Sequence, residues 1–553
     1  MKKHSLFKFI SIILILILIT CYFLQDRYGS NTYFGVMGVG LRYVQTLYYF
    51  FYLVVFLLAV GGLYGVLNKA PSYKKMLDNI VTYVKPFGKK FIFLLIILIS
   101  IISSFTGITM PLIIFVPFLC AIILLLGYDK LVAVSTTVVS SLVGYFGGVF
   151  VTIMNSSTQK FETFESFVGL DNQFSNIFPK LLLLFAGIAL LITFVNSHIV
   201  NVEKKKVKYE LSDDSELLVN EVKGDYKNIK VWPLAVSLFL LFAIIILGLF
   251  PISSLFDFTF FSDLHSTIFS ISLGDALIRL ILIILVVGLT LLVKWIVTLI
   301  KKSKFKFNLV LPLWISFVVV LTFEVLDTLE VFDLYAFSFI GKLTTLFNKP
   351  EALKLLLVPD FISSDLRAFG EWGIQGDNLS YCLITLFVVV FTLIIARLNK
   401  IKFNDFLDYE IDGIKKMVPT AMLICLAFAV LICGYQNGFL ETIISNYGKF
   451  NYFVSGALVL LGSIINVDIY YIAVGVFTPV LNIITDESVY SSVALLFQGI
   501  YAMVSVISPT SLILIFALSY FDIPYTTWVK YIWRFILGLI IILALVLMIV
   551  ALL

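Results

Sequence analysis

Charge is what this sequence lacks most. Its 553 residues include 39 Lys and Arg and 34 Asp and Glu, so only 13% of the chain is charged, whereas 61% is hydrophobic. Soluble globular domains are about 25% charged and about 45–50% apolar. A water-facing surface cannot be built from this composition, which excludes the roughly three or four soluble domains that the length alone would suggest. Together with a mean hydropathy of +1.06, it indicates a polytopic membrane protein.

Side chains for catalysis, metal binding and redox chemistry are also scarce. There are 3 histidines, and the 5 cysteines stand in or beside apolar runs without metal or redox spacing, as small buried hydrophobic residues do. The sequence has no cluster of His, Cys and carboxylates, no nucleophile elbow and no glycine-rich phosphate loop. These absences argue against an enzyme, a resident cofactor, nucleotide-driven pumping and nucleic-acid binding.

Long apolar runs fill the chain instead. The first, from about 6 to 24, has no small-residue cleavage site, so we predict a retained helix. Two later runs, 91–126 and 453–483, are too long for one span and short for two, and we predict that both are re-entrant hairpins. At about 20 residues per span, the fold class is an all-α polytopic membrane protein with about eleven transmembrane helices. The other runs lie near 46–68, 131–156, 179–199, 232–250, 276–300, 308–324, 378–396, 417–435, 490–520 and 534–553.

The few basic residues are distributed unequally between the two sides of the membrane. If the N-terminus is cytoplasmic and each long run enters and leaves on one side, roughly three quarters of the 39 basic residues fall in cytoplasmic segments, as the positive-inside rule requires. This predicts a multi-pass protein of a bacterial-type cell membrane. A half-way hairpin and a pair of full spans both return the chain to the side of the membrane where it started. The distribution of basic residues therefore leaves that choice open.

The two ends of the chain follow one plan. Residues 46–199 contain a span, an amphipathic stretch, a hairpin (91–126) and two further helices, and 417–553 repeat this order with opposite orientation around hairpin 453–483. Inverted-topology repeats are characteristic of secondary transporters, whose site lies between the repeats near the midplane. The remaining segments are a first helix and outer loop (1–45), a cytoplasmic linker (200–231), and central helices with an outer connector (232–416).

Polar residues interrupt the apolar runs at matched places in the two repeats. Broken backbone within a bilayer must be buried in protein or line a cavity, and hydroxyls, amides and free carbonyls there can bind an ion or a substrate. Pro509, for example, removes a backbone donor and so frees a carbonyl. We predict a site lined by Ser103, Ser104, Thr106, Gly107, Asn155, Ser156, Asn466, Asp468, Ser505, Ser508, Pro509 and Thr510.

Each of these residues also has a structural interpretation. Ser, Thr and Gly in membrane helices serve close packing and interhelical hydrogen bonds. Asp468 either binds a proton or cation or lies at the membrane interface, because a carboxylate at depth costs about 2.5–3.5 kcal/mol. A Na⁺ site would draw on Ser104, Asn155, Asn466 and Thr510, and H⁺ is the other candidate coupling ion.

Several longer stretches resemble a transporter family. They are Gly61–Lys69, Ile102–Leu131 with Pro111 and Pro117, Phe403–Asp408 with Asp412–Met417, Ile507–Ser511, and Ile523-Pro524. Through them the chain resembles the YfcC family, in the DcuC-type branch of the ion transporter superfamily, and is distantly similar to the AbgT transporters. The resemblance covers about 46–160 and 400–553.

The resemblance implies a scaffold domain and a mobile transport domain with two re-entrant hairpins, in a homodimer surrounded by membrane lipids. It implies ion-coupled movement of small organic anions or amino acids. The chain departs from the family pattern where Ser156 replaces a Pro after Asn155, and where the second hairpin carries Asn466-Val467-Asp468 instead of a Ser/Gly-rich tip. These departures predict a shifted specificity.

We therefore expect an ion-coupled secondary active transporter of small carboxylate-bearing solutes, either amino acids or C4-dicarboxylates, working by uptake or exchange. An exporter of amino-acid conjugates or peptides with the same fold is the alternative. A non-transporting membrane scaffold or a membrane enzyme is a third hypothesis. It would need a cluster of catalytic polar residues at one surface, and the sequence offers none.

Overall fold

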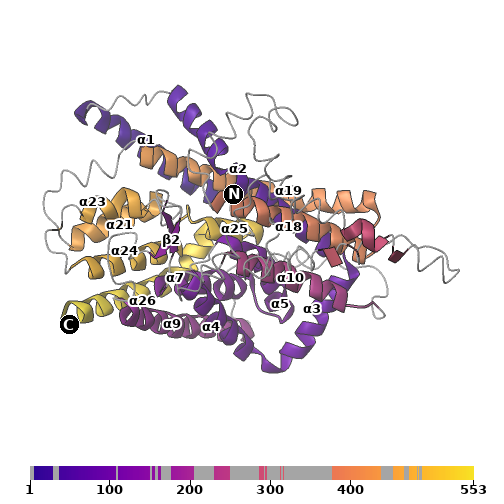
Figure 1. Cartoon of the computed structure of the whole chain (residues 1–553). Coiled ribbons are helices and arrows are strands. Elements are labelled where there is room, and N and C mark those ends of the chain that lie inside the picture. Colours follow the sequence, from indigo (N-terminus) through magenta and orange to yellow (C-terminus); the bar gives the residue numbers. More distant parts are fainter. Residues whose placement is uncertain are drawn as a thin grey trace, which may run out of the picture. The chain divides into compact units, whose positions relative to one another are not determined.

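The protein is almost entirely helical in the part that its structure describes (Figure 1). The computed structural model describes residues 5–28, 36–106, 110–149, 152–155, 160–163, 176–204, 229–249, 286–291, 293–294, 312, 315–316, 377–436, 452–465, 472–481, 484 and 489–552. The predicted all-α polytopic class is confirmed. The predicted outer connector and most of the predicted cytoplasmic linker lie outside these residues.

Two compact units can be distinguished. One comprises Met1–Asn155, Lys160–Phe242 and Thr385–Leu553, and it contains both predicted repeats. The other comprises Ser156–Gln159 and Ala243–Ile384 and lies largely outside the described residues. Everything below concerns the first unit.

The first repeat consists of short and long helices in the predicted order. Their bounds are α2 Val36–Leu67, α3 Pro71–Val84, α4 Lys89–Thr106, α5 Val116–Leu125, α6 Lys130–Val134, α7 Ser140–Phe146 and α9 Ile177–Glu203, with a π-helical segment η3 at Ser135–Val139 and 3₁₀ segments η1 at Lys85–Phe87 and η2 at Met110–Ile114. Helix α1, Ser5–Tyr28, precedes them, and α10, Trp232–Leu249, follows.

Helix α18, Asp377–Leu398, lies in the predicted central segment. The predicted second repeat contains most of α19 Phe403–Gln436, then α21 Tyr452–Ile465, the π-helical segment η6 Ala473–Phe477, α23 Thr478–Leu481, α24 Tyr490–Ser505, α25 Leu512–Tyr520 and α26 Tyr525–Leu552. Helix α19 runs through the predicted boundary between 416 and 417. It joins an amphipathic start to an apolar end in one helix with Pro419 inside it.

Within the described residues, three helices are long and apolar enough to cross a membrane, namely Ile177–Glu203, Phe403–Gly434 and Tyr525–Val550. Phe51–Leu67 and Pro71–Phe87 pass the same test together but are bent by 85°. The bend falls where Pro71 occupies the first turn of α3, because a proline lacks the N–H that would continue the preceding helix. Helix α3 is the predicted amphipathic stretch.

Both long apolar runs are interrupted, as predicted. Helix α4 ends at Thr106 and α5 begins at Val116, while α21 ends at Ile465 and η6 begins at Ala473. At 1.5 Å per residue, the 14 residues of α21 extend about 21 Å, less than the ~30 Å of a hydrocarbon core. The described helix α21 is therefore shorter than a full span, and the re-entrant hairpins remain a prediction.

The predicted helix 131–156 is wrong at its C-terminal end. The helix stops at Phe146, and Thr152–Asn155 form strand β1, which pairs antiparallel with β2, Lys160–Thr163, in the register Thr152↔Thr163 to Asn155↔Lys160. Two successive glycines, Gly147 and Gly148, weaken the helix there, and the β-branched and aromatic residues that follow favour extended backbone. Continuous hydrophobicity hid this change.

Contacts between helices match in the two repeats. Helix α4 packs on α7 and α7 on α9 in the first, as α21 packs on α24 and α24 on α26 in the second. Among the contacts that join the two halves, α7 meets α24, and α9 lies beside α26 (Figure 1). Helices α2 and α19 form a further tight pair, because a Cβ on Gly413 would lie 2.1 Å from the carbonyl oxygen of Gly61.

Candidate functional site

The broken end of α7 meets the end of α4, in the predicted first hairpin. Ser104, in the last turn of α4, is fully buried. Its Oγ donates to the carbonyl oxygen of Gly147 at 2.8 Å and accepts the backbone N–H of Val149 at 3.3 Å. One hydroxyl thus replaces helical partners on both sides of the break, which fixes the end of α7 against α4.

Close packing of glycines brings α4, α7 and α9 together at this point. A Cβ on Gly144 would lie 2.3 Å from the carbonyl oxygen of Ser100 and 2.7 Å from Cβ of Ser103. A Cβ on Gly147 would lie 2.3 Å from the backbone nitrogen of Leu184 in α9. These glycines serve backbone contact, as the structural interpretation of small residues predicted.

The second break, between α24 and α25, has its own polar pair. The hydroxyls of Ser508 and Thr510 lie 2.7 Å apart, and Thr510 Oγ1 donates to the carbonyl oxygen of Ile464 at 2.6 Å. Ile464 is next to the last residue of α21, directly before the predicted tip Asn466–Asp468. The break is therefore attached to the end of α21, as Ser104 attaches the end of α4 to α7.

Two aromatic side chains of α26 donate hydrogen bonds to backbone carbonyl oxygens that this break frees. Tyr525 OH donates to the carbonyl oxygen of Ile507 at 2.8 Å, and Trp528 Nε1 donates to that of Val506 at 3.0 Å. Trp528 is fully buried. The unwound segment therefore offers fewer free carbonyls than its sequence suggests.

Gln498 joins the two repeats. It lies in α24, is 1% exposed, and its Nε2 donates to the carbonyl oxygens of Tyr145 at 3.1 Å and Gly148 at 2.8 Å. Its Oε1 is buried and has no hydrogen-bond partner among the described residues. Such an unpaired acceptor costs about 1–3 kcal/mol, so a buried ligand that meets it would be favoured. Sequence reasoning placed Gln498 in the polar cluster of this helix but did not include it among the predicted site residues.

The predicted site residues fall into three groups. Those with described side chains are all buried: Ser103, Ser104, Ser505, Ser508, Pro509 and Thr510. Thr106 ends α4 and Asn155 ends β1. Gly107, Ser156, Asn466 and Asp468 lie outside the described residues.

The two breaks are not in direct contact through these side chains. The bonds of Ser104 go to the end of α7, whereas Ser505 Oγ donates to the carbonyl oxygen of Tyr501 in its own helix. Gln498 lies two turns before the second break and reaches the first, so α24 connects the two halves of the candidate site. The described residues contain no group of three or more His, Cys, Asp or Glu that could hold a metal.

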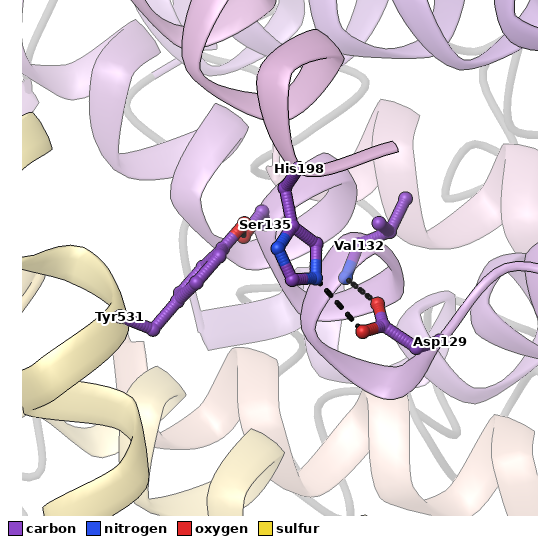
Figure 2. A network of polar contacts seen from close by, with 5 residues as sticks. All are labelled: Asp129, Val132, Ser135, His198 and Tyr531. Atoms are coloured by element: carbon purple, nitrogen blue, oxygen red, sulfur yellow. Dashed lines mark hydrogen bonds and ion pairs between the residues drawn. The ribbon is translucent and has the colours of Figure 1, made fainter. Parts of the chain in front are cut away.

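A separate polar network lies where α6, α9 and α26 meet (Figure 2). Asp129 caps α6 by accepting the N–H of Val132 at 2.9 Å, and its other oxygen lies 2.8 Å from Nε2 of His198. The ring of His198 contacts Tyr531 edge-on, and Tyr531 OH is 3.1 Å from Ser135 Oγ. The turn predicted at Asp129 is thus a junction of α6, α9 and α26.

The phenol beside this junction is held neutral. Burial raises the pKa of Tyr128, and the carboxylate of Glu203 raises it further. The described contacts of the network, the 2.8 Å pair of Asp129 and His198 and the hydroxyls of Tyr531 and Ser135, tie α6, α9 and α26 together.

Comparison with known proteins identifies the family. The chain matches the family model of DcuC, described as C4-dicarboxylate anaerobic carrier, over residues 43–552. Comparison with curated proteins and with solved structures gave no match. The family match extends over both repeats, both breaks and the centre between them, and it confirms the resemblance drawn from the motifs. The chain belongs to the DcuC family of C4-dicarboxylate anaerobic carriers.

Proposed function

We propose that this protein is a secondary active transporter that carries C4-dicarboxylates across the cell membrane, coupled to the movement of Na⁺ or H⁺. The observation that carries the proposal is the family match over residues 43–552. The two polar breaks support it, since secondary transporters with inverted repeats bind their substrates at discontinuous helices.

The second break suits one carboxylate of the substrate. Helix α25 begins at Leu512 after an extended Ser511 whose side chain makes no capping bond. The N–H groups of a first helical turn and the helix dipole favour an anion. The Ser508 and Thr510 hydroxyls stand directly before that turn. In this proposal the free N–H groups of that turn bind a substrate carboxylate, the bonded Ser508 and Thr510 hydroxyls hold the turn in place, and Asn466 adds an amide donor.

The first break suits the coupling ion. Its described groups are a serine hydroxyl and backbone carbonyls, all neutral oxygen donors to a cation, of the kind that unwound membrane helices offer. A cation there would offset part of the charge of a dicarboxylate and so link the two binding events. Movement of the hairpins with α7 and α24 as one body would then carry both ligands.

Counterflow in proteoliposomes tests the proposal. Vesicles containing the purified protein are loaded with unlabelled succinate and diluted into labelled succinate, with fumarate, malate, aspartate and a dipeptide as competitors. We expect protein-dependent accumulation that the C4-dicarboxylates abolish. Absence of accumulation with every carboxylate would refute transport of this class. Competition by the dipeptide alone would favour the alternative substrates, amino-acid conjugates or peptides.

A further inference from the structure

The amide oxygen of Gln498 is a ligand for which the mechanism above has no use. We infer that Gln498 Oε1, with the carbonyl oxygens at the end of α7, forms the binding site of the coupling cation, and that this cation is Na⁺. The inference deepens the proposed function, on which its link to transport rests. Cation binding itself can be measured without any carboxylate.

The orientation of this amide is fixed by its donors. Nε2 is bonded to the carbonyl oxygens of Tyr145 and Gly148, which uses both of its N–H groups. A flipped amide would set its oxygen against two carbonyl oxygens, so these contacts settle which end is which. Oε1, on the same planar group, therefore lies beside the end of α7. The side chain is 1% exposed, and this oxygen has no partner in the described part of the chain.

The groups around Oε1 are rich in acceptors and poor in donors. The described contacts use one lone pair on the carbonyl oxygen of Gly147, through Ser104, and one on that of Gly148, through Gln498. A carbonyl oxygen has two, so each retains one. The hydroxyl proton of Ser104 and the N–H of Val149 are already engaged. What remains at this point is a set of oxygen lone pairs.

A cation fits such a set better than an anion or a neutral hydroxyl does. The C-terminal end of a helix carries partial negative charge, and α7 ends here. Hard cations prefer oxygen ligands, and neutral carbonyl, amide and hydroxyl oxygens suit a monovalent ion, whereas Ca²⁺ and Mg²⁺ sites use carboxylates. The described site residues include no carboxylate at this break. Of the two candidate coupling ions, Na⁺ fits this set, because neutral carbonyl, amide and hydroxyl oxygens do not hold a proton near neutral pH.

Glycine packing holds the carbonyls in place. Gly144 and Gly147 bring α7 into backbone contact with α4 and α9, so these oxygens cannot move apart without disturbing both helices.

A Na⁺ titration of thermal stability, without substrate, tests the inference. The purified full-length protein in detergent is melted at increasing NaCl, with choline chloride keeping the ionic strength constant. Ligand that binds the native state raises the apparent melting temperature by mass action. We expect a Na⁺-specific rise in the wild type and a midpoint at least about tenfold higher in Gln498→Met. Ser100→Ala, which removes a hydroxyl of the same α4–α7 contact, should keep the wild-type midpoint.

A second variant keeps the test decisive if Gln498→Met does not fold. In Gln498→Glu, Na⁺ and a proton compete for the new carboxyl group, so the Na⁺ midpoint should fall as the pH rises from 6 to 8, whereas the wild-type midpoint should not. A Gln498→Met protein with the wild-type midpoint, a Gln498→Glu protein without pH dependence, or a wild type that does not distinguish Na⁺ from choline would each overturn the inference.

The two proposals fail separately. Succinate counterflow that does not depend on Na⁺ would support the proposed transport function, refute the Na⁺ site and favour H⁺ as the coupling ion. A Na⁺-specific stabilisation that Gln498→Met weakens, in a protein that carries no carboxylate, would keep the cation site and refute the proposed substrate.

Discussion

Replacing Gly147 by Ala tests whether the end of α7 must stay where the structure holds it. The new Cβ would lie 2.3 Å from the backbone nitrogen and 2.5 Å from the Cα of Leu184. Both are backbone atoms of α9, so no rotamer change relieves the overlap. Helix α7 would have to move by about 1 Å to reach ordinary van der Waals separation.

The cost of that displacement follows from the contacts. Overpacking a tight interior costs about 1–3 kcal/mol. The same movement stretches the 2.8 Å bond from Ser104 Oγ to the Gly147 carbonyl oxygen beyond hydrogen-bonding distance, and a lost hydrogen bond adds about 1 kcal/mol. We expect a destabilisation of about 2–4 kcal/mol and loss of most succinate counterflow.

Thermal unfolding in detergent and counterflow in proteoliposomes measure the two effects. Gly456→Ala is the matched control, because the atom nearest to its new Cβ is Ile500 Cδ1 at 3.6 Å, an ordinary contact. Ala also favours helix over Gly by about 1 kcal/mol, so the control should melt at the wild-type temperature or slightly higher. A Gly147→Ala protein that melts and transports like the wild type would refute the reasoning.

Three further substitutions test other contacts. Thr510→Val removes the hydroxyl bonded to the last turn of α21, and we expect about a fivefold higher KM for succinate uptake; an unchanged KM contradicts its role. In a double-mutant cycle, Asp129→Asn and His198→Phe should show about 1 kcal/mol of coupling free energy by thermal unfolding; additive effects would contradict an interaction between these two side chains. Trp528→Phe should lower stability by about 1–3 kcal/mol, since it leaves a buried carbonyl unpaired; a wild-type melting temperature would argue against that bond.

The inference about Gln498 shows where sequence reasoning stops. Its helix was predicted, and so was the break that follows it, because Ser508-Pro509-Thr510 interrupts an apolar run. The partners of its amide lie about 350 residues earlier in the chain, at Tyr145 and Gly148. No local pattern encodes such a pairing, since it depends on how two repeats pack against each other.

The end of α7 shows a second limit. The apolar stretch after Gly148 continues the hydrophobicity of the preceding helix, and periodicity cannot distinguish a buried strand from a buried helix in so short a run. The glycines that end the helix are visible in the sequence. Their contacts with Ser100 and Leu184, which make them necessary, are not.

By itself, the sequence determined the membrane environment, the broken apolar runs and the resemblance to the DcuC-type branch. Transfer into a bilayer is roughly additive over neighbouring residues, and proline, glycine and hydroxyl residues act on the backbone where they stand, so these properties are local. Only the tertiary structure decided which groups meet at the breaks: Ser104 with Gly147, Thr510 with Ile464, Gln498 with the end of α7, and the α26 aromatics with the carbonyls of Val506 and Ile507. Those pairings join segments far apart in the chain, and they follow from the packing of helices on one another.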